Sequence, residues 1–165
     1  LSRLDEEEGG TESVGGDAVA ADLLAAVDRA RTLVAEHHDV RVEDDIVLED
    51  AAARYALGPL AVSRIVANLL SNAIRAVGER GVITVRARDA GGELVLRVED
   101  DGPGVPRDFL PVAFERFSRA DASRRQEGSG LGLALVAAIA AAAGGDARAE
   151  NLGPGFAVEV RLPKM

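Results

Sequence analysis

The sequence GSGLGLAL at residues 128–135 places three glycines at alternate positions, directly before an apolar and alanine-rich run. Glycines at the start of a helix allow another group to approach the backbone closely. A helix start also carries unpaired N–H groups and the positive end of the peptide dipoles, so a phosphate is a natural ligand there. The stretch therefore predicts a helix over 131–143 with an anion-binding turn at Gly128, Gly130 and Gly132. A glycine-rich turn also begins helices for packing reasons alone, so other motifs have to decide between the two interpretations.

Two common phosphate-binding loops do not fit this stretch. The P-loop needs a lysine immediately after its last glycine, but Leu133 stands there and Lys164 is the only lysine of the chain. The dinucleotide-binding fingerprint follows a strand, whereas this stretch follows the polar segment 119–127. The sequence therefore requires a different phosphate-binding architecture.

Composition narrows the function classes. The 165 residues are enough for one domain with a core, and the net charge of −9 argues against nucleic acid or an anionic membrane as a general partner. The chain has no cysteine and only two histidines, which excludes a disulfide framework and a thiolate or histidine metal cage, and fits a reducing compartment. No apolar stretch reaches 18 residues without charges or glycines. Since the first residue is Leu1, we interpret the chain as a piece of a longer protein.

Hydrophobic periodicity and turn residues predict a mixed succession of helices and strands. Residues 1–18 are acidic and glycine-rich and are expected to be a flexible linker, with the folded domain over 19–165. Helices are predicted over 19–36, 59–77 and 131–143, and strands over 40–48, 53–57, 82–88, 93–99, 147–151 and 156–162. The segment 100–129 is broken by glycine and proline, and a loop of that length is typical of a lid or a binding loop.

Two asparagines interrupt the apolar stripe of the helix predicted over 59–77. Asn68 and Asn72 are four residues apart and share one face, with Arg75 one turn beyond Asn72. Amides at such positions are costly unless they are used, and an amide oxygen can bind Mg²⁺, which completes its shell with water and phosphates.

Two further motifs follow along the chain. In DDGPG at 100–104, Asp100 ends a strand and can accept a hydrogen bond from an amine such as that of adenine, while the glycines allow a planar base to pack closely. In FERFSR at 114–119, aromatic anchors alternate with Arg116 and Arg119, which can reach a terminal phosphate from a mobile loop.

The order of these four motifs resembles the catalytic and ATP-binding domain of sensor histidine kinases, in the ATPase superfamily shared with DNA gyrase and a heat-shock chaperone. NLLSNA at 68–73 looks like the asparagine box, DDGPG the first glycine box, FERFSR the phenylalanine box and GSGLGL at 128–133 the second glycine box. LSRLDEEEGG at 1–10 resembles the end of a dimerisation helix that precedes such domains. The resemblance implies a two-layer α/β sandwich, a mixed sheet with helices on one face and an ATP lid loop.

The resemblance also implies roles for individual residues. Asn72 would bind Mg²⁺, with Asn68 and Arg75 contacting the metal or the phosphates. Asp100 would read adenine in a pocket shaped by Gly102 and Gly104, and Arg116 or Arg119 would approach the γ-phosphate. The second glycine box would close on the phosphates through Gly128, Gly130, Leu131 and Gly132.

Three departures or coincidences qualify the resemblance. Ala76 stands where many members carry an aromatic residue, so a stacking contact on adenine is missing. Asn68 stands where members that hydrolyse ATP tend to carry a glutamate, which favours transfer to a histidine over hydrolysis. His38 begins an imitation of the phosphoacceptor box, but Val42 and Glu43 break the pattern inside the ATP-binding domain, so we do not expect His38 to be the acceptor.

The implied activity is transfer of the ATP γ-phosphate to a histidine on a dimerisation domain outside this chain, for relay to an aspartate of a response regulator. The chain alone is expected to bind ATP and Mg²⁺ as a monomer with little activity, within a homodimeric bacterial protein anchored in the cell membrane. Two alternatives remain: an anti-sigma-type kinase that phosphorylates serine, and a nucleotide-sensing module without transferase activity.

Overall fold

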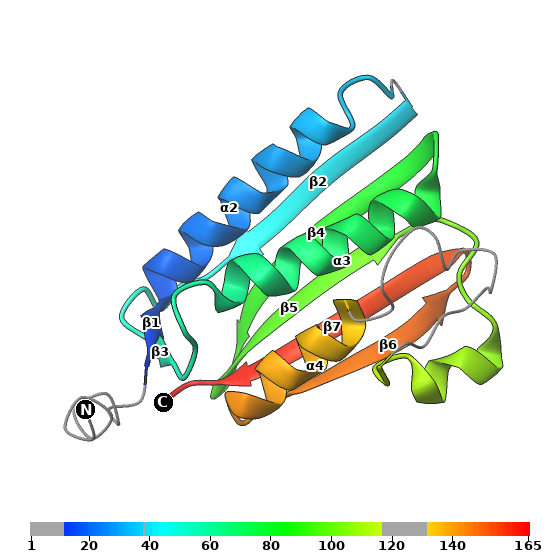
Figure 1. The fold of residues 1–165 in the computed structure, drawn as a ribbon. Helices are drawn as coiled ribbons and strands as arrows, with labels where there is room; N and C mark the ends of the chain where they lie inside the picture. The colour runs from blue at the N-terminus through cyan, green and yellow to red at the C-terminus, as the bar shows by residue number, and fades with distance from the viewer. Residues whose placement is uncertain (1–11, 38, 117–131) are drawn as a thin grey trace, which may run out of the picture.

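The computed structural model describes residues 12–37, 39–116 and 132–165, which form a two-layer α/β sandwich (Figure 1). Three helices cover one face of a five-stranded mixed sheet, as the predicted fold class requires. The helices are α2 (Gly16–Leu33), α3 (Ala61–Val77) and α4 (Gly132–Ala142). The strands lie in the order β2 (Asp39–Val47), β4 (Arg80–Ala90), β5 (Glu93–Asp100), β7 (Gly155–Pro163) and β6 (Asp146–Leu152).

The sheet combines one parallel pair with three antiparallel pairs. β2 and β4 are parallel, and the segment between them contains α3 as the crossover helix that a parallel connection needs. β4 and β5 form the predicted hairpin, in which Gly91 has φ +66° at the turn. β6 and β7 form a second antiparallel pair at the far side of the sheet. α3 packs over β4 and β5, and α4 packs over β6 and β7.

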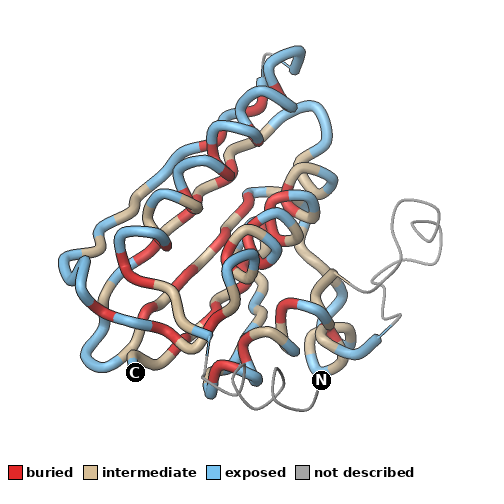
Figure 2. The backbone as a smooth tube through the Cα atoms, turned by 60° about the vertical axis from the view of Figure 1, so that its left-hand side comes forward, coloured by how far each residue is buried: buried red, intermediate tan, exposed pale blue. Residues whose placement is uncertain are grey.

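The core lies between the helices and the sheet. Buried residues follow the inner faces of the helices and alternate along β5, as Figure 2 shows in red. The largest of the fully buried aliphatic side chains are Leu23, Ile65, Ile83, Leu94, Leu96 and Leu162. Burial of such side chains contributes roughly 1.5–3 kcal/mol each.

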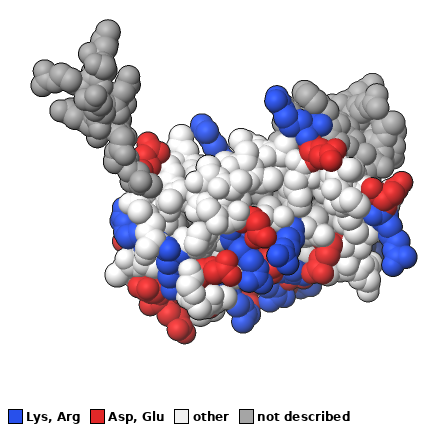
Figure 3. All heavy atoms as spheres, turned by 90° about the horizontal axis from the view of Figure 1, so that it is seen from below, with Lys and Arg blue, Asp and Glu red and all other residues white. Residues whose placement is uncertain are grey.

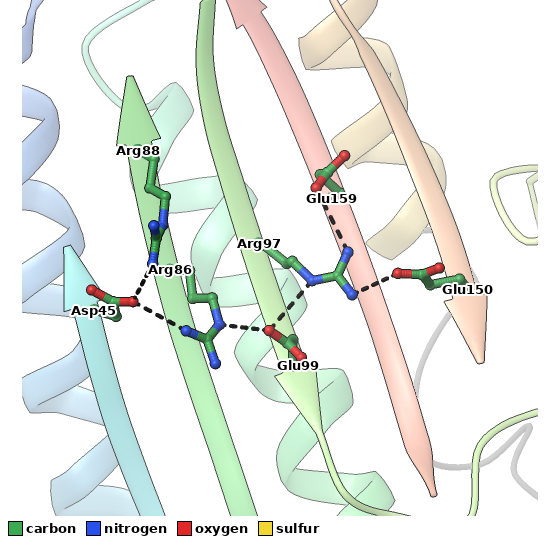
Figure 4. A network of polar contacts seen from close by, with 7 residues as sticks. All are labelled: Asp45, Arg86, Arg88, Arg97, Glu99, Glu150 and Glu159. Atoms are coloured by element: carbon green, nitrogen blue, oxygen red, sulfur yellow. Dashed lines mark hydrogen bonds and ion pairs between the residues drawn. The ribbon is translucent and has the colours of Figure 1, made fainter. Parts of the chain in front are cut away.

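The opposite face of the sheet carries charged side chains instead of helices. Figure 3 shows basic and acidic side chains gathered on one side of the molecule. At the centre of this face, Arg97 lies 2.6 Å from Glu150, 3.3 Å from Glu99 and 3.6 Å from Glu159. The network continues through Glu99 to Arg86 and Asp45, so that it links all five strands (Figure 4).

The structure differs from the sequence prediction near the N-terminal end. α2 begins at Gly16 rather than at residue 19, and Val14–Gly15 form β1, which pairs with β3 (Arg54–Tyr55). The Gly16 N–H donates to the Ala53 carbonyl at 2.9 Å, and a Cβ on Gly16 would lie only 2.4 Å from the Asp50 carbonyl oxygen. This close approach of two backbones fixes the start of α2, and it involves residues too distant in sequence for periodicity to reveal.

The remaining differences are smaller. β3 has two residues rather than the five predicted over 53–57, and α3 begins at Ala61, two residues after the predicted start. Within the segment predicted as irregular, Arg107–Val112 form a 3-10 helix, η1. Gly78 (φ +64°) ends α3 as expected.

Candidate nucleotide-binding site

Asn68 lies on the half-buried side of α3 and faces the beginning of α4. Its side-chain N–H donates to the Arg64 carbonyl at 2.8 Å. A Cβ built on Gly132 would lie 3.1 Å from Asn68 Oδ1, so this contact leaves little room for a side chain at the start of α4. The structure thus brings the asparagine motif beside the last glycine of the second glycine-rich motif.

Asn72 lies one turn further along α3 and is also half-buried. Its Oδ1 accepts a hydrogen bond from Arg75 Nη2 at 2.5 Å, and Arg75 Nη1 donates to Ser71 Oγ at 3.1 Å. The amide oxygen predicted to bind Mg²⁺ is therefore held by the arginine predicted to contact phosphates.

Asp100 is the one buried charged residue of the described core, with 6 % of its surface exposed. It ends β5, and its Oδ1 accepts a hydrogen bond from the Gly102 N–H at 2.9 Å. Burial raises the pKa of this carboxyl, and the negative charge of Asp101 adds to the effect, against the backbone hydrogen bonds of Gly102 and Phe156. No cationic side chain of the described residues contributes to that balance. A buried carboxylate without a cation suits a neutral hydrogen-bond donor such as an aromatic amine.

The glycines that follow Asp100 are required by close contacts. A Cβ on Gly102 would lie 2.8 Å from the Ala76 carbonyl oxygen of α3. Gly104 has φ +78°, and its Cβ would lie 2.8 Å from Asn151 Oδ1. The loop therefore packs against the end of α3 on one side and against β6 on the other.

These contacts arrange the candidate residues in a row along α3. Ala76, Asn72 and Asn68 follow one another at four-residue spacing, with Gly102 against the first and Gly132 against the last. The eight steps from Asn68 to Ala76 span about 12 Å of helix. An elongated ligand that lies along this row would meet a carboxylate at one end and the N-terminus of α4 at the other.

The rest of the predicted site is placed only in part. Arg116 is exposed at the end of a described segment, whereas Arg119, Gly128, Gly130 and Leu131 lie outside the described residues. Within the described parts of the chain there is no group of three or more His, Asp or Glu side chains that could hold a metal ion. The Asn72 amide oxygen is a ligand of the kind that Mg²⁺ uses together with water and phosphate oxygens.

A separate hollow of about 360 Å³ lies near the start of α3 and does not coincide with this row. Its lining includes Leu57, Pro59, Arg64, Ile139 and Ala142. Asn72 and Asp100 do not line it, so this hollow and the candidate chemistry are distinct.

The two histidines and the possibility of a membrane helix are separate from this row. His37 is exposed after α2, and His38 lies outside the described residues. None of the helices in the described parts of the chain is long and apolar enough to cross a membrane.

The motifs did not indicate Asn151, which contacts the glycine loop from β6. An asparagine just before Gly153-Pro154-Gly155 resembles an ordinary turn residue, so only its position opposite the loop reveals the contact.

Comparison with known families agrees with this geometry. Residues 58–165 match the model of the family described as histidine kinase-, DNA gyrase B- and HSP90-like ATPase. The chain therefore belongs to this ATPase family, and within it to the ATP-binding catalytic domains of sensor histidine kinases. The predicted family and kind of domain are confirmed.

Individual relatives support the narrower class. The signal transduction histidine-protein kinase AfsQ2 of Streptomyces coelicolor is 46 % identical over 110 residues, which are 66 % of this chain and 20 % of the relative. The sensor histidine kinase component HK1 of Mycobacterium tuberculosis is 44 % identical over 109 residues, which are 66 % of this chain and 64 % of the relative. The chain thus spans less than two thirds of either relative.

A solved structure shows the same architecture. The mycobacterial sensor histidine kinase MprB superposes with a TM-score of 0.76 and 27 % identity, over 93 % of this chain and 98 % of that one. The five-stranded sheet and its three covering helices are therefore those of a histidine kinase catalytic domain.

Proposed function

We propose that the chain binds ATP with Mg²⁺ along α3 and donates the γ-phosphate to a histidine of a dimerisation domain outside this chain. The observation that carries the proposal is the row from Gly102 and Ala76 through Asn72 to Asn68 and Gly132. This row joins three of the four sequence motifs at one surface. In the transfer, the bond between the γ-phosphorus and the ADP oxygen breaks and a phosphorus–nitrogen bond to the histidine forms.

Each residue has a role that its surroundings support. Asp100 accepts a hydrogen bond from the adenine amine, because no cationic side chain of the described residues satisfies its buried carboxylate. Gly102 and Gly104 keep the base pocket narrow, and the N-terminus of α4 at Gly132 favours phosphate. Gly128, Gly130 and Leu131 are proposed to complete this phosphate contact.

The metal end of the site depends on Asn72. Its amide oxygen would bind Mg²⁺, which neutralises charge on the phosphates, while Arg75 and Asn68 would bind the phosphate oxygens. Arg116 and Arg119 are proposed to stabilise the γ-phosphate as charge develops during transfer. Asn68 cannot act as the base that activates water, so we propose that transfer to protein dominates over hydrolysis.

The proposal extends to the parent protein. We propose that the residues before β1 connect this domain to a dimerisation helix, that the parent is a membrane-anchored homodimer, and that the phosphoryl group passes on to an aspartate of a response regulator. The sequence identity of 46 % and 44 % to two named sensor histidine kinases supports this arrangement.

The first test is nucleotide binding. Calorimetry with ATP, with and without Mg²⁺, is expected to show magnesium-dependent binding that Asn72→Ala weakens chiefly in the presence of Mg²⁺. Asp100→Asn should weaken binding in both conditions. Glu79→Gln, an exposed change just beyond α3, is a control that should bind normally. Absence of binding by the wild-type chain would contradict the proposal.

The second test identifies the acceptor. A separately produced dimerisation domain is mixed with this chain and labelled ATP, and the phosphorylated product is treated with acid and with base. A product that acid destroys and base preserves supports a histidine acceptor. A product stable to acid would indicate a serine kinase, and a lack of any phosphoprotein would indicate a nucleotide-sensing module.

A further inference from the structure

Asn151, in β6, holds the glycine loop (residues 101–106) through both groups of its side-chain amide. The Val105 N–H donates to Asn151 Oδ1 at 2.9 Å, and Asn151 Nδ2 donates to the Val105 carbonyl at 2.7 Å. The side chain thus pairs with one residue's backbone as a neighbouring strand would. Two short bonds of opposite direction fix both the position and the orientation of that backbone.

The register of the sheet places this contact beside Asp100. Asp100 pairs with Phe156 across β5 and β7, and Phe156 pairs with Asn151 across β7 and β6. Residues paired in this way project from the same face of a sheet. Asp100 and Asn151 therefore stand on the helix-covered face, two strands apart, and the loop that begins after Asp100 is fastened at its far end by Asn151.

The loop is confined on both sides between these anchor points. Gly102 lies against the Ala76 carbonyl of α3, and Gly104 lies against Asn151 Oδ1 and the Gly155 carbonyl. Any side chain at Gly104 would occupy the space through which Val105 reaches Asn151. The glycine and the asparagine therefore depend on each other.

From this geometry we propose that Asn151 is a positioning residue of the nucleotide site. It holds the glycine loop so that the Gly102 N–H stays bonded to Asp100 Oδ1, which aims the carboxylate at the adenine amine. The inference rests on the proposed function, and it adds a residue from a strand that carries none of the four motifs. Asn151 does not touch the nucleotide and acts through the loop.

The expected effect follows from the two hydrogen bonds. Asn151→Ala removes both, and ATP affinity is expected to fall about tenfold, the usual scale for one or two lost bonds. ADP affinity should fall by the same factor, because the loop supports the base and not the γ-phosphate. The preference for ATP over inosine triphosphate, which lacks the amine, should become smaller. A residue that only supported the fold would not change this preference.

The experiment combines a measurement without nucleotide and one with it. Hydrogen exchange of the Val105 amide tests the clamp, by which we mean the two hydrogen bonds between Asn151 and Val105. Calorimetry with ATP, ADP and inosine triphosphate tests whether this clamp positions the nucleotide site. Arg148→Ala is the matched control, since Arg148 is exposed on the same strand and forms an ion pair with Asp146 at 3.3 Å. It should change neither measurement.

Three results would overturn the proposal. Unchanged Val105 exchange in Asn151→Ala would show that the clamp does not hold the loop. Faster exchange with unchanged nucleotide affinity and preference would show that the loop needs no positioning. If the wild-type chain has a protected Val105 amide but binds no ATP, the proposed function fails together with the positioning role, while the clamp itself stands.

A second variant covers the case in which Asn151→Ala does not fold. Asn151→Asp keeps the acceptor for the Val105 N–H but sets a carboxylate against the Val105 carbonyl. Its Val105 amide should exchange faster than in the wild type, and its preference for ATP over inosine triphosphate should be smaller. Faster exchange with a wild-type preference would contradict the proposal.

Discussion

Asp89 and Asp100 lie at opposite ends of the same hairpin. Their surroundings suit Asp89 to stabilising the fold and Asp100 to binding a ligand. Asp89 lies near the end of β4, where it pairs with Leu94, and Asp100 ends β5, where it pairs with Ile83. Both carboxylates are largely withdrawn from water, with 16 % of the Asp89 side chain and 6 % of Asp100 exposed. Only one of them is surrounded by groups that satisfy its charge.

Asp89 has partners from two other segments of the chain. Its Oδ2 accepts from the Glu49 N–H at 2.8 Å and the Asp50 N–H at 3.4 Å, and Lys164 Nζ lies 3.1 Å from Oδ1. The Lys164 ammonium lowers the pKa of Asp89 both as a hydrogen-bond partner and through its charge. Burial alone favours the neutral acid, but these partners together lower the pKa of Asp89. The Asp89 carboxylate therefore connects β4 to the segment before β3 and to the C-terminus.

Asp100 has the opposite balance. Burial is the largest influence and raises its pKa, and the neighbouring charge of Asp101 acts in the same direction. A protein that keeps an uncompensated carboxylate buried at the end of a strand loses stability there, which is a common property of binding sites. The two residues should therefore respond differently when their carboxylates are removed.

The largest effect is expected from Asp100→Asn on nucleotide affinity. The amide keeps an acceptor for the Gly102 N–H but presents a poorer partner to the adenine amine, so ATP affinity should fall roughly 10- to 100-fold. The variant should unfold at the same temperature as the wild type or higher, because an uncompensated charge is removed. Calorimetry and thermal unfolding measure the two effects. A clear loss of stability with unchanged affinity would reverse the distinction drawn between the two aspartates.

Asp89→Ala is expected to give the reverse pattern. It leaves two backbone N–H groups without their acceptor and should lower the free energy of unfolding by about 2 kcal/mol. The substitution also removes the carboxylate partner of Lys164, whose side chain is only 20 % exposed. Urea unfolding measures the loss, and ATP affinity at a temperature where the variant is folded should equal that of the wild type.

Glycines at the two ends of the hairpin offer a matched comparison. Gly102→Ala would bring a Cβ to 2.8 Å from the Ala76 carbonyl and should cost about 1–2 kcal/mol of stability, with weaker ATP binding. Gly92→Ala, at the hairpin turn, meets nothing within 4 Å and should change neither quantity. Equal effects of the two substitutions on ATP affinity would show that the glycine loop has no special place in binding.

The charged face of the sheet can be compared with the surroundings of Asp89 and Asp100. On this face the paired charged side chains are partly exposed to water. Arg97→Ala removes one guanidinium from three carboxylates and should lower stability by about 1 kcal/mol, with a smaller loss at high salt. Arg148→Ala, with one exposed partner, should lower it by less than about 0.5 kcal/mol. Urea unfolding at low and high salt compares the two variants. Salt-independent losses would argue against an electrostatic role for this face.

The sequence predicted most of the fold because the elements carry their own signals. The hydrophobic stripe of α3, the alternation of β5 and the glycine turn of the hairpin each identify an element from neighbouring residues. β1 and the early start of α2 were missed because they depend on contacts with residues 50–55, about 40 positions away. Two-residue strands have no periodicity to detect.

The candidate site shows the same division. Asn68, Asn72, Asp100 and Gly102 stood out because polar or glycine residues interrupt apolar patterns, and the structure brings them together along α3. The supporting contacts remained hidden, because Asn151 and Asp89 have ordinary sequence surroundings and act across strands. Roles for the individual site residues stay predictions until binding is measured.

The smallest effect, and the most specific test of the comparison, is the pH dependence of stability. The lowered pKa of Asp89 means that its contribution is present above about pH 4 and is lost as pH falls through the lowered value. The raised pKa of Asp100 means that stability is highest below about pH 4 and declines as pH rises through the raised value. Between pH 7 and acid pH, the deficit of Asp89→Ala relative to wild type should therefore shrink. Any advantage of Asp100→Asn should also shrink over this range, because the wild-type carboxyl becomes neutral. Thermal unfolding of both variants and the wild type across this pH range measures the two trends, and a deficit of Asp89→Ala that grows toward acid pH would show that Asp89 is not held in its charged form.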